Sequence, residues 1–194
     1  MNKDALLQYI ASYIQLDPKE EETLLTKVKF RQYLKNQFLV QAGDINKYSN
    51  FILKGCAKAF HLDENGQQHI RDFAIENWWT GDLGSFLSQE PGQYYVQCIE
   101  DCQIAQISYD DMEVLYGLIP KMERFFRIII QKAYVVSQKR ITQYQSLTAI
   151  EKYRRFKNEY PKFVERIPQY LIASYLGITP EFLSSIRKQI ANND

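Results

Sequence analysis

The polar side chains best suited to contacting a ligand lie near the end of the chain, in the segment IPQYLIASYLGITPEFLSSIRKQI (167–190). The spacing of one set places hydroxyl, carboxylate and cationic groups along the outer side of a single helix: Thr179, Glu181, Ser184, Ser185, Arg187 and Lys188. Short polar and positively charged groups of this kind meet base edges and phosphates in the major groove of DNA. The spacing therefore predicts a helix that contacts DNA.

The apolar residues of the same segment predict how that helix is held. A first helix carries Ile172 and Leu176 on one face, and Gly177 suits the left-handed backbone that ends a helix. Thr179 and Pro180 suit the start of the next helix. Its apolar positions recur at three and four residues, at Leu183, Ile186 and Ile190. Two short helices around a glycine turn are typical of a helix-turn-helix, and an ordinary helical hairpin that closes a core stays open as the alternative.

Residue sets that perform catalysis are not evident. The sequence contains no Gly-rich phosphate loop followed by Lys-Ser/Thr, no His-Glu-x-x-His and no nucleophile elbow. The only histidines are His61 and His69, and two ligands do not make a structural zinc site. We expect Cys56, Cys98 and Cys102 to be small core residues, with a redox pair as the alternative. The sequence thus predicts no enzyme, no metal and no cofactor.

Composition favours a folded protein of the cytoplasm. Hydrophobic residues make up 45% and charged residues 24% of the 194 residues, which are ordinary values for a globular chain. No apolar run approaches the roughly 20 residues of a membrane helix, and the first residues do not read as a signal peptide. Three cysteines are too few for a disulfide scaffold, so a reduced cytoplasmic protein is expected.

Charge is distributed unevenly along the chain. Residues 30–117 carry 6 Lys and Arg against 12 Asp and Glu, whereas residues 118–147 carry 6 against 1 and residues 148–194 carry 8 against 5. An acidic part followed by a basic part indicates that the C-terminal third meets an anionic partner. Two solvated surfaces of opposite sign are the other interpretation.

The elements that must position these residues begin with helical spacing over residues 2–15, and Asp17-Pro18 begins a second short helix. From about residue 30 to 108, short apolar runs alternate with glycine turns, and "DENG" predicts a hairpin. No helical pattern interrupts them, so we expect a small antiparallel β-barrel. A helix from Thr148 to Pro161 precedes the closing segment.

The longest helical stretch covers residues 118–145. Its apolar residues alternate at four and three as in a coiled coil, at Met122, Phe126, Ile129, Ala133 and Val136. Such a stripe must be buried. It either covers the protein's own barrel or pairs with a second copy, and the length of the stripe favours a homodimer.

With these elements in order, the chain resembles the Crp/Fnr family of bacterial transcription regulators over nearly its whole length. The most specific segments are TGDLGSF (80–86) and IASYLGITPEFLSSIRK (172–188), the latter similar to regulators from the Bacteroidetes group. The resemblance implies an α+β fold with an N-terminal helix, an antiparallel β-roll of the cyclic nucleotide-binding jelly-roll type, a long dimerisation helix and a C-terminal winged helix-turn-helix. The implied domains are an effector domain (1–117), a dimerisation helix (118–147) and a DNA-binding domain (148–194).

The same resemblance implies the partners and an effector pocket. A homodimer would bind a two-fold symmetric site in double-stranded DNA and recruit or block RNA polymerase, with no membrane partner. The pocket positions implied are Gly81, Asp82, Leu83, Gly84, Tyr94, Tyr95 and Ser137.

Three positions of the β-roll depart from the pattern of cyclic-AMP-binding relatives, and Val136 of the long helix stands where such relatives have a Thr. Asp82 replaces the family's longer Glu, and Tyr94 and Tyr95 stand where an Arg and a Ser or Thr hold the cyclic phosphate. A buried phosphate without a cation loses its charge-assisted hydrogen bonds. We therefore expect that the pocket does not bind cyclic AMP and holds another effector or none.

The recognition helix also departs from the family pattern. Pro180 and Ser185 replace arginines that read guanine in relatives, while Glu181 matches a base-contacting Glu that can accept from cytosine N4. The operator of well-known members is therefore not expected here. A module of the same fold that binds a ligand or a protein, but no DNA, remains the alternative function.

Overall fold

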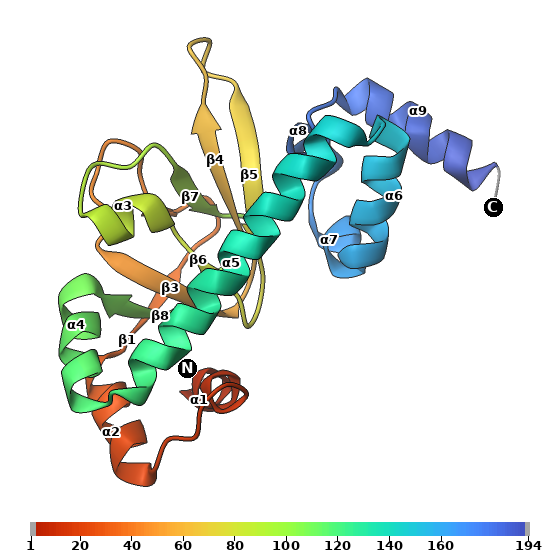
Figure 1. Ribbon diagram of the computed structural model, residues 1–194. Coiled ribbons are helices and arrows are strands. Elements are labelled where there is room, and N and C mark those ends of the chain that lie inside the picture. The colour runs from red at the N-terminus through yellow and green to blue at the C-terminus, as the bar shows by residue number, and fades with distance from the viewer. Residues whose placement is uncertain (1–2, 193–194) are drawn as a thin grey trace. The chain divides into compact units, whose positions relative to one another are not determined.

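The computed structural model describes residues 3–192 of the chain (Figure 1). Its helices are α1 (Lys3–Ala11), α2 (Pro18–Lys27), α3 (Leu83–Ser88), α4 (Tyr109–Leu118), α5 (Lys121–Ser146), α6 (Ala149–Glu159), α7 (Pro161–Arg166), α8 (Gln169–Leu176) and α9 (Pro180–Ala191). Its strands are β1 (Lys29–Tyr33), β2 (Phe38–Val40), β3 (Tyr48–Lys54), β4 (Ala57–Leu62), β5 (Gln68–Ala74), β6 (Trp79–Thr80), β7 (Tyr95–Cys98) and β8 (Cys102–Ser108).

The chain divides into two compact units. The first contains the residues up to His61 together with Arg71–Gln131, and the second contains Leu62–Ile70 and the residues from Lys132 onward. The division falls inside α5 rather than at either of its ends, and the tip of the β4–β5 hairpin belongs to the second unit. The functional boundaries at residues 117 and 147 stay predictions, because compactness does not test what each part does.

The strands form two four-stranded sheets, with strand orders β1-β8-β3-β6 and β2-β7-β4-β5. Strand β8 runs antiparallel between β1 and β3, and β7 runs antiparallel to both β2 and β4. Strands far apart in sequence thus pair side by side, as in a jelly roll. The α+β class and the antiparallel roll are confirmed, although the strands make two sheets rather than the single closed barrel we expected.

Alternating side chains of β3 and β8 serve two cores, because successive residues of a strand point to opposite faces. Ile52 and Ile104 point into a cluster shared with residues of the second sheet. Their neighbours Phe51 and Ala105 point the other way, into a cluster with α1, α2, α4 and the start of α5. The β1-β8-β3-β6 sheet is therefore covered by strands on one face and by helices on the other.

Local capping explains where several helices begin. Asp17 accepts the N–H of Glu20, whose side chain accepts the N–H of Asp17, and the same reciprocal box joins Thr148 to Glu151 at the start of α6. Such boxes satisfy N–H groups that a helix start leaves without partners. The predicted starts at Asp17 and Thr148 are confirmed.

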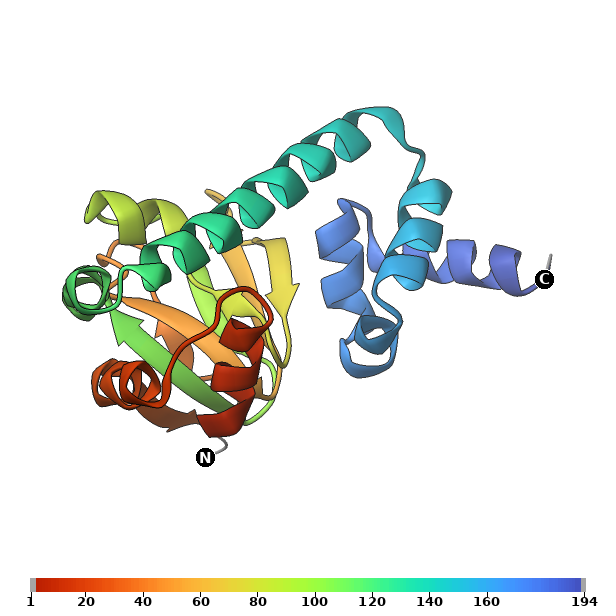
Figure 2. The same ribbon diagram turned by 60° about the horizontal axis from the view of Figure 1, so that its bottom comes forward.

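Helices α6 to α9 build the second unit around buried apolar residues of each helix. These residues are Tyr153, Phe156, Phe163, Leu171, Ile172, Ala173, Leu176, Leu183, Ile186 and Ile190. Figure 2 shows α9 running at a wide angle to α6. The helices of the predicted helix-turn-helix therefore bury the apolar side that the sequence predicts.

The hairpin tip packs on α8 within this unit. The Ser174 hydroxyl donates to the Gln68 carbonyl oxygen (2.8 Å) and accepts the N–H of Ile70 (3.2 Å). The Arg140 guanidinium donates to the Ile70 carbonyl oxygen (3.2 Å) and stacks over the Tyr175 ring, 4.4 Å from its centroid. One serine and one arginine thus fix the main chain of β5 to helical residues far along the chain.

Three sequence predictions are corrected by the structure. Helix α3 interrupts the stretch predicted to be strands alone, because Asp82 caps a helix there. Helix α4, in a segment for which no element was predicted, follows β8 directly with Ser108 as its cap. Pro161 begins α7 rather than ending helical structure. The described residues after α5 contain helices and no strand, so the predicted wing is absent from them; the sequence there lacks strand-like alternation.

Candidate functional site

The predicted effector pocket is built around one buried carboxylate. Asp82 is 5% exposed and ends the turn that leads into α3. Its Oδ1 atom accepts the N–H of Ser85 (3.3 Å), and its Oδ2 atom accepts the N–H groups of Gln93 (3.1 Å) and Tyr94 (3.3 Å). Hydrogen bonds to an ionised group are the strong ones. Both carboxylate oxygens are thus engaged by the segment's own main chain.

The loop after α3 closes tightly over this carboxylate. A Cβ atom added at Gly92 would stand 2.5 Å from Asp82 Oδ2 and 3.0 Å from Ser85 Cβ, so only glycine fits there. The Ser85 hydroxyl donates to the Glu90 carbonyl oxygen (2.6 Å) and accepts the N–H of Asn46 (2.9 Å). The predicted residues from Gly81 to Gly84 therefore serve an internally bonded turn.

An arginine outside the predicted pocket residues stands beside this turn. Arg71 donates to the Gly81 carbonyl oxygen (2.8 Å), pairs with Asp72 (2.7 Å) and lies over the Tyr94 ring, 4.2 Å from its centroid. Burial lowers the pKa of Arg71, but Asp72, Tyr94 and Asp82 outweigh this, and the net direction is upward. A cation is therefore present, supplied by β5 rather than by the closing segment. No local sequence signal indicates this, because the contact depends on strand packing.

The two tyrosines of the closing segment have different surroundings. Tyr94 contacts Arg71 and meets His61 edge-on, with the ring centroids 6.1 Å apart. Tyr95 stacks on Phe60 at 5.2 Å and lies 5.8 Å from Phe38. The two rings therefore do not fill one pocket together.

The side chains of Leu83 and Ser137 make none of the hydrogen bonds and ring contacts described above. Leu83 is partly exposed at the start of α3. Ser137 is exposed on α5 and belongs to the second unit. Its role as a pocket residue stays a prediction.

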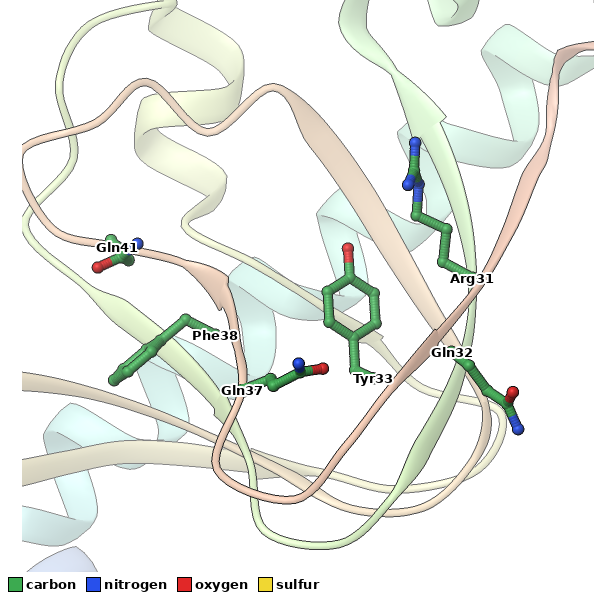
Figure 3. A pocket seen from close by; sticks show the side chains of 6 residues that line it. All are labelled: Arg31, Gln32, Tyr33, Gln37, Phe38 and Gln41. Atoms are coloured by element: carbon green, nitrogen blue, oxygen red, sulfur yellow. The ribbon is translucent and has the colours of Figure 1, made fainter.

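An open hollow of about 510 Å³ lies elsewhere on the first unit, lined by Arg31, Gln32, Tyr33, Gln37, Phe38 and Gln41 (Figure 3). Figure 3 shows Gln37 reaching toward Tyr33, while Gln32 points away from it. The hollow includes none of the predicted pocket residues.

The turn between α8 and α9 has the geometry that the sequence predicts. Gly177 adopts the left-handed conformation (φ 70°, ψ 33°) and donates its N–H to the Ser174 carbonyl oxygen (3.1 Å), while Ile178 donates to Ala173 (3.0 Å). These two bonds form a Schellman motif. The Thr179 hydroxyl then accepts the N–H of Phe182 (3.2 Å) and caps α9. The chain reverses within a few residues and is held at both ends.

The structure places the predicted DNA-contacting residues together on the outside of α9. All six are exposed: Thr179, Glu181, Ser184, Ser185, Arg187 and Lys188. The Ser185 hydroxyl donates to the Glu181 carbonyl oxygen (3.2 Å), so its oxygen remains as an acceptor. The apolar residues Leu183, Ile186 and Ile190 are buried on the opposite side.

Phe182 of α9 is exposed although it was not predicted as part of the site. The Phe182 side chain is 51% exposed although it is the helix's largest apolar group. The spacing carries no signal for this, because Phe182 lies four residues before Ile186 and fits the apolar pattern of the buried side.

The residues of the predicted dimer seam differ in burial along α5. Met122 and Phe126 are buried in the core of the first unit, and Ile129 packs against that core. The first two cannot contact a second copy, which corrects the seam at these positions; helical periodicity does not say which partner buries a stripe. Ala133 and Val136 are exposed.

Helix α5 exposes further large apolar residues in the same half of the helix, at Tyr134, Val135 and Ile141.

None of the helices among the described residues has the length and apolar character needed to cross a membrane. Residues 3–192 also contain no group of three or more His, Cys, Asp or Glu arranged to hold a metal ion. Cys56, Cys98 and Cys102 are buried and form no disulfide.

Comparison with known proteins identifies the relatives of this chain. Residues 30–117 match the cyclic nucleotide-binding domain. The anaerobic regulatory protein of Haemophilus influenzae is 24% identical over 165 residues, covering 78% of this chain and 63% of that protein. The cAMP-activated global transcriptional regulator Vfr of Pseudomonas aeruginosa is 28% identical over 115 residues, covering 54% of each. The aligned part is thus under two thirds of the length of these two relatives.

Two solved structures illustrate the fold that this chain shares. The structure of FixK2 from Bradyrhizobium japonicum has a TM-score of 0.76 at 16% identity, covering 86% of this chain and 85% of that chain. The c-di-GMP responsive global regulator CLP of Xanthomonas campestris has a TM-score of 0.72 at 17% identity, covering 91% and 93%. At these identities the likeness shows the fold alone. Residues 30–117 are thus a cyclic nucleotide-binding domain, and the chain is a homologue of the Crp/Fnr-type transcription regulators.

Proposed function

We propose that this chain is a transcription regulator that binds double-stranded DNA as a homodimer through α9. The observation that carries the proposal is the two-sided character of that helix. Leu183, Ile186 and Ile190 anchor one side in the second unit, and the opposite side exposes Glu181, Ser184 and Lys188. A second helix held in this way lies in the major groove in helix-turn-helix proteins.

The exposed groups have distinct tasks in such a complex. Arg187 and Lys188 meet phosphates, and Glu181 accepts from cytosine N4. The Thr179 hydroxyl fixes the start of the helix, so these side chains project from a rigid element. The exposed Arg154 and Lys157 of α6 add positive charge to the same unit.

The second half of α5 provides the surface for a second copy. Ala133, Tyr134, Val136 and Ile141 are exposed on one helix, which is unusual unless a partner covers them. Two copies joined there present two α9 helices to two half-sites, so the operator has two-fold symmetry. Bound in this way, the dimer recruits or blocks RNA polymerase.

The proposed regulator does not respond to cyclic AMP. The Asp82 carboxylate is engaged by Ser85, Gln93 and Tyr94, and the Arg71 guanidinium is engaged by Asp72 and Gly81. A ribose hydroxyl and a cyclic phosphate would have to displace these hydrogen bonds. The domain holds a different effector or none, and we assign it no catalytic role, in keeping with relatives that are regulators.

Salt dependence of DNA binding tests the proposal. Affinity for a mixed-sequence duplex, measured by fluorescence anisotropy, is expected to fall on the order of a thousandfold between about 50 and 200 mM salt if roughly six phosphates are neutralised. The double variant Arg187→Ala/Lys188→Ala lowers the slope by about one for each phosphate that is no longer neutralised. Lys35→Ala/Lys54→Ala, two exposed lysines of the first unit, is the control and leaves the slope unchanged. Absent or salt-insensitive binding would instead support a module that binds protein.

Thermal unfolding tests separately whether the domain binds cyclic AMP. A ligand at about a thousand times its dissociation constant stabilises a protein by about 4 kcal/mol. Thermal unfolding with millimolar cyclic AMP is expected to match unfolding without it. A clear rise in Tm contradicts the closed pocket and leaves the DNA-binding proposal intact.

A further inference from the structure

The exposed ring on α9 points to a residue that selects the DNA sequence. Phe182 is 51% exposed, whereas the other large apolar residues of this helix, Leu183, Ile186 and Ile190, are between 1% and 6% exposed. An exposed ring forgoes the free energy that burial of an apolar side chain gives. Single exposed apolar residues are common on proteins, so position and chemistry must decide what this one does.

The position of Phe182 is at the start of the recognition helix. It is the third residue of α9, and its own N–H is held by the Thr179 hydroxyl at 3.2 Å. Ser185 and Gln189 follow at three and seven residues, and both are exposed. Ile186 follows at four residues and is buried, so Phe182 lies where the exposed side of the helix meets the buried side. The N-terminal residues of a recognition helix are those that reach base edges. A large ring at this position therefore faces a base edge in the proposed complex.

The chemistry of the ring narrows what it can meet there. A phenylalanine ring gains no hydrogen bond or ion pair from a phosphate, because it has neither a positive charge nor an N–H or O–H donor. In the major groove, the apolar group that a base edge presents is the C5-methyl of thymine, and phenylalanine is one of the side chains that pack on it. The neighbouring Glu181 suits a different base, cytosine, so the two residues read different features.

We propose that Phe182 packs on a thymine methyl in each half-site and makes binding depend on that methyl. This rests on the proposed DNA-binding function and adds the base that α9 selects. A protein partner covering the ring is the competing occupant, and it predicts DNA binding without any dependence on thymine methyls.

The test removes one methyl group at a time. The full chain selects duplexes from a random pool, and each thymine of the selected site is then replaced by deoxyuridine, which lacks only the C5-methyl. Burial of one such group is worth roughly a fourfold change in affinity. We expect a loss of about fourfold at one thymine per half-site, measured by fluorescence anisotropy at fixed salt.

Variants assign that loss to the ring. In Phe182→Ala, thymine and deoxyuridine duplexes bind equally, while Phe182→Leu, which keeps an apolar side chain, retains part of the difference. Tyr170→Ala removes an exposed aromatic of α8 and is the control, with the thymine dependence unchanged. Circular dichroism establishes that each variant is folded.

The outcomes separate this inference from the function it rests on. Selective binding without a methyl effect overturns the role of Phe182 and leaves DNA binding standing. A methyl effect that persists in Phe182→Ala also overturns it, since another residue then reads the methyl. A chain that binds no DNA at any salt concentration overturns both.

Discussion

The Oδ2 atom of Asp82 accepts the main-chain N–H of Gln93 at 3.1 Å. The same oxygen also accepts from Tyr94, so one carboxylate holds the two ends of the α3 turn together. A resemblance to cyclic-AMP-binding relatives predicts a carboxylate here that faces a ligand. In this chain the shorter side chain is turned inward and serves the fold.

Asp82→Asn tests this role. The amide of asparagine can accept at one atom only, so at least one main-chain N–H would face another donor in a buried site. An unsatisfied buried N–H costs about 1–3 kcal/mol. We expect the free energy of unfolding in urea to fall by about 2 kcal/mol. Asp44→Asn, the same change at an exposed carboxylate of the first unit, is the control and leaves stability within about 0.5 kcal/mol. Equal stabilities of both variants would contradict the structural role of Asp82.

Gly177→Ala tests the turn that joins α8 to α9. Gly177 has φ 70°, a left-handed conformation that costs a residue with a Cβ atom about 1–2 kcal/mol. The variant is expected to lose about 1 kcal/mol in the second unit, seen as faster amide hydrogen exchange in both helices. The matched control is Gly117→Ala in α4, where an added Cβ meets open space and improved helix propensity favours slight stabilisation. If both variants behave alike, the left-handed turn is not a constraint.

The sequence predicts features that depend on neighbouring residues. The caps at Asp17 and Thr148 and the left-handed glycine at Gly177 each involve groups only a few residues apart, so residue type and spacing suffice. The burial of one side of α9 follows in the same way from a spacing of three and four. These are interactions that a short segment makes with itself.

Features that depend on strand packing could not be predicted. Arg71 reaches Gly81 and Tyr94 because β5 lies beside the α3 turn, and Ser174 reaches Gln68 across 106 positions. The stripe on α5 was visible, but its period is the same whether a barrel or a second copy covers it. Only the fold shows that Met122 is buried in the core of its own chain.

Acid stability depends on the carboxylate of Asp111 in the first turn of α4. A hydrogen bond from the Ser108 hydroxyl, with a smaller contribution from Lys27, lowers the pKa of Asp111 below its ordinary 3.8. A lowered folded pKa stabilises the fold above the unfolded value, and this contribution is lost as the pH falls through the folded pKa. Asp111→Asn is therefore expected to lower stability at pH 7 and to lose less of it than the wild type between pH 4 and pH 2. Urea unfolding across this range checks it, with Asp110→Asn of the same helical turn as control. Parallel pH curves for wild type and Asp111→Asn would contradict the assignment.

The contact of the hairpin tip with α8 can be tested in the second unit. Ser174→Ala removes the hydroxyl that bonds both Gln68 and Ile70, leaving an N–H and a carbonyl oxygen of β5 without this partner. The expected loss is about 1 kcal/mol, seen mainly as faster hydrogen exchange at the Ile70 amide. Ser184→Ala, at an exposed serine of α9, should leave that amide unchanged. Unchanged exchange in Ser174→Ala would mean that the tip is held by other contacts.

The second half of α5 decides whether the chain pairs with itself. Val136 is 57% exposed, so Val136→Asp leaves the monomer fold unaltered but places a charge in the proposed seam, where desolvation penalises it. We expect analytical ultracentrifugation to show a dimer for the wild type and a monomer for this variant. Thr142→Asp adds the same charge at an exposed position on another side of the helix and should remain dimeric, because no residue of the proposed seam lies three or four positions from it. Ile129→Asp is less informative, because Ile129 packs against the core of the first unit and its loss would also disturb the fold. A Val136→Asp protein that sediments as a dimer would move the seam away from this stripe and leave its exposed apolar residues without an explanation.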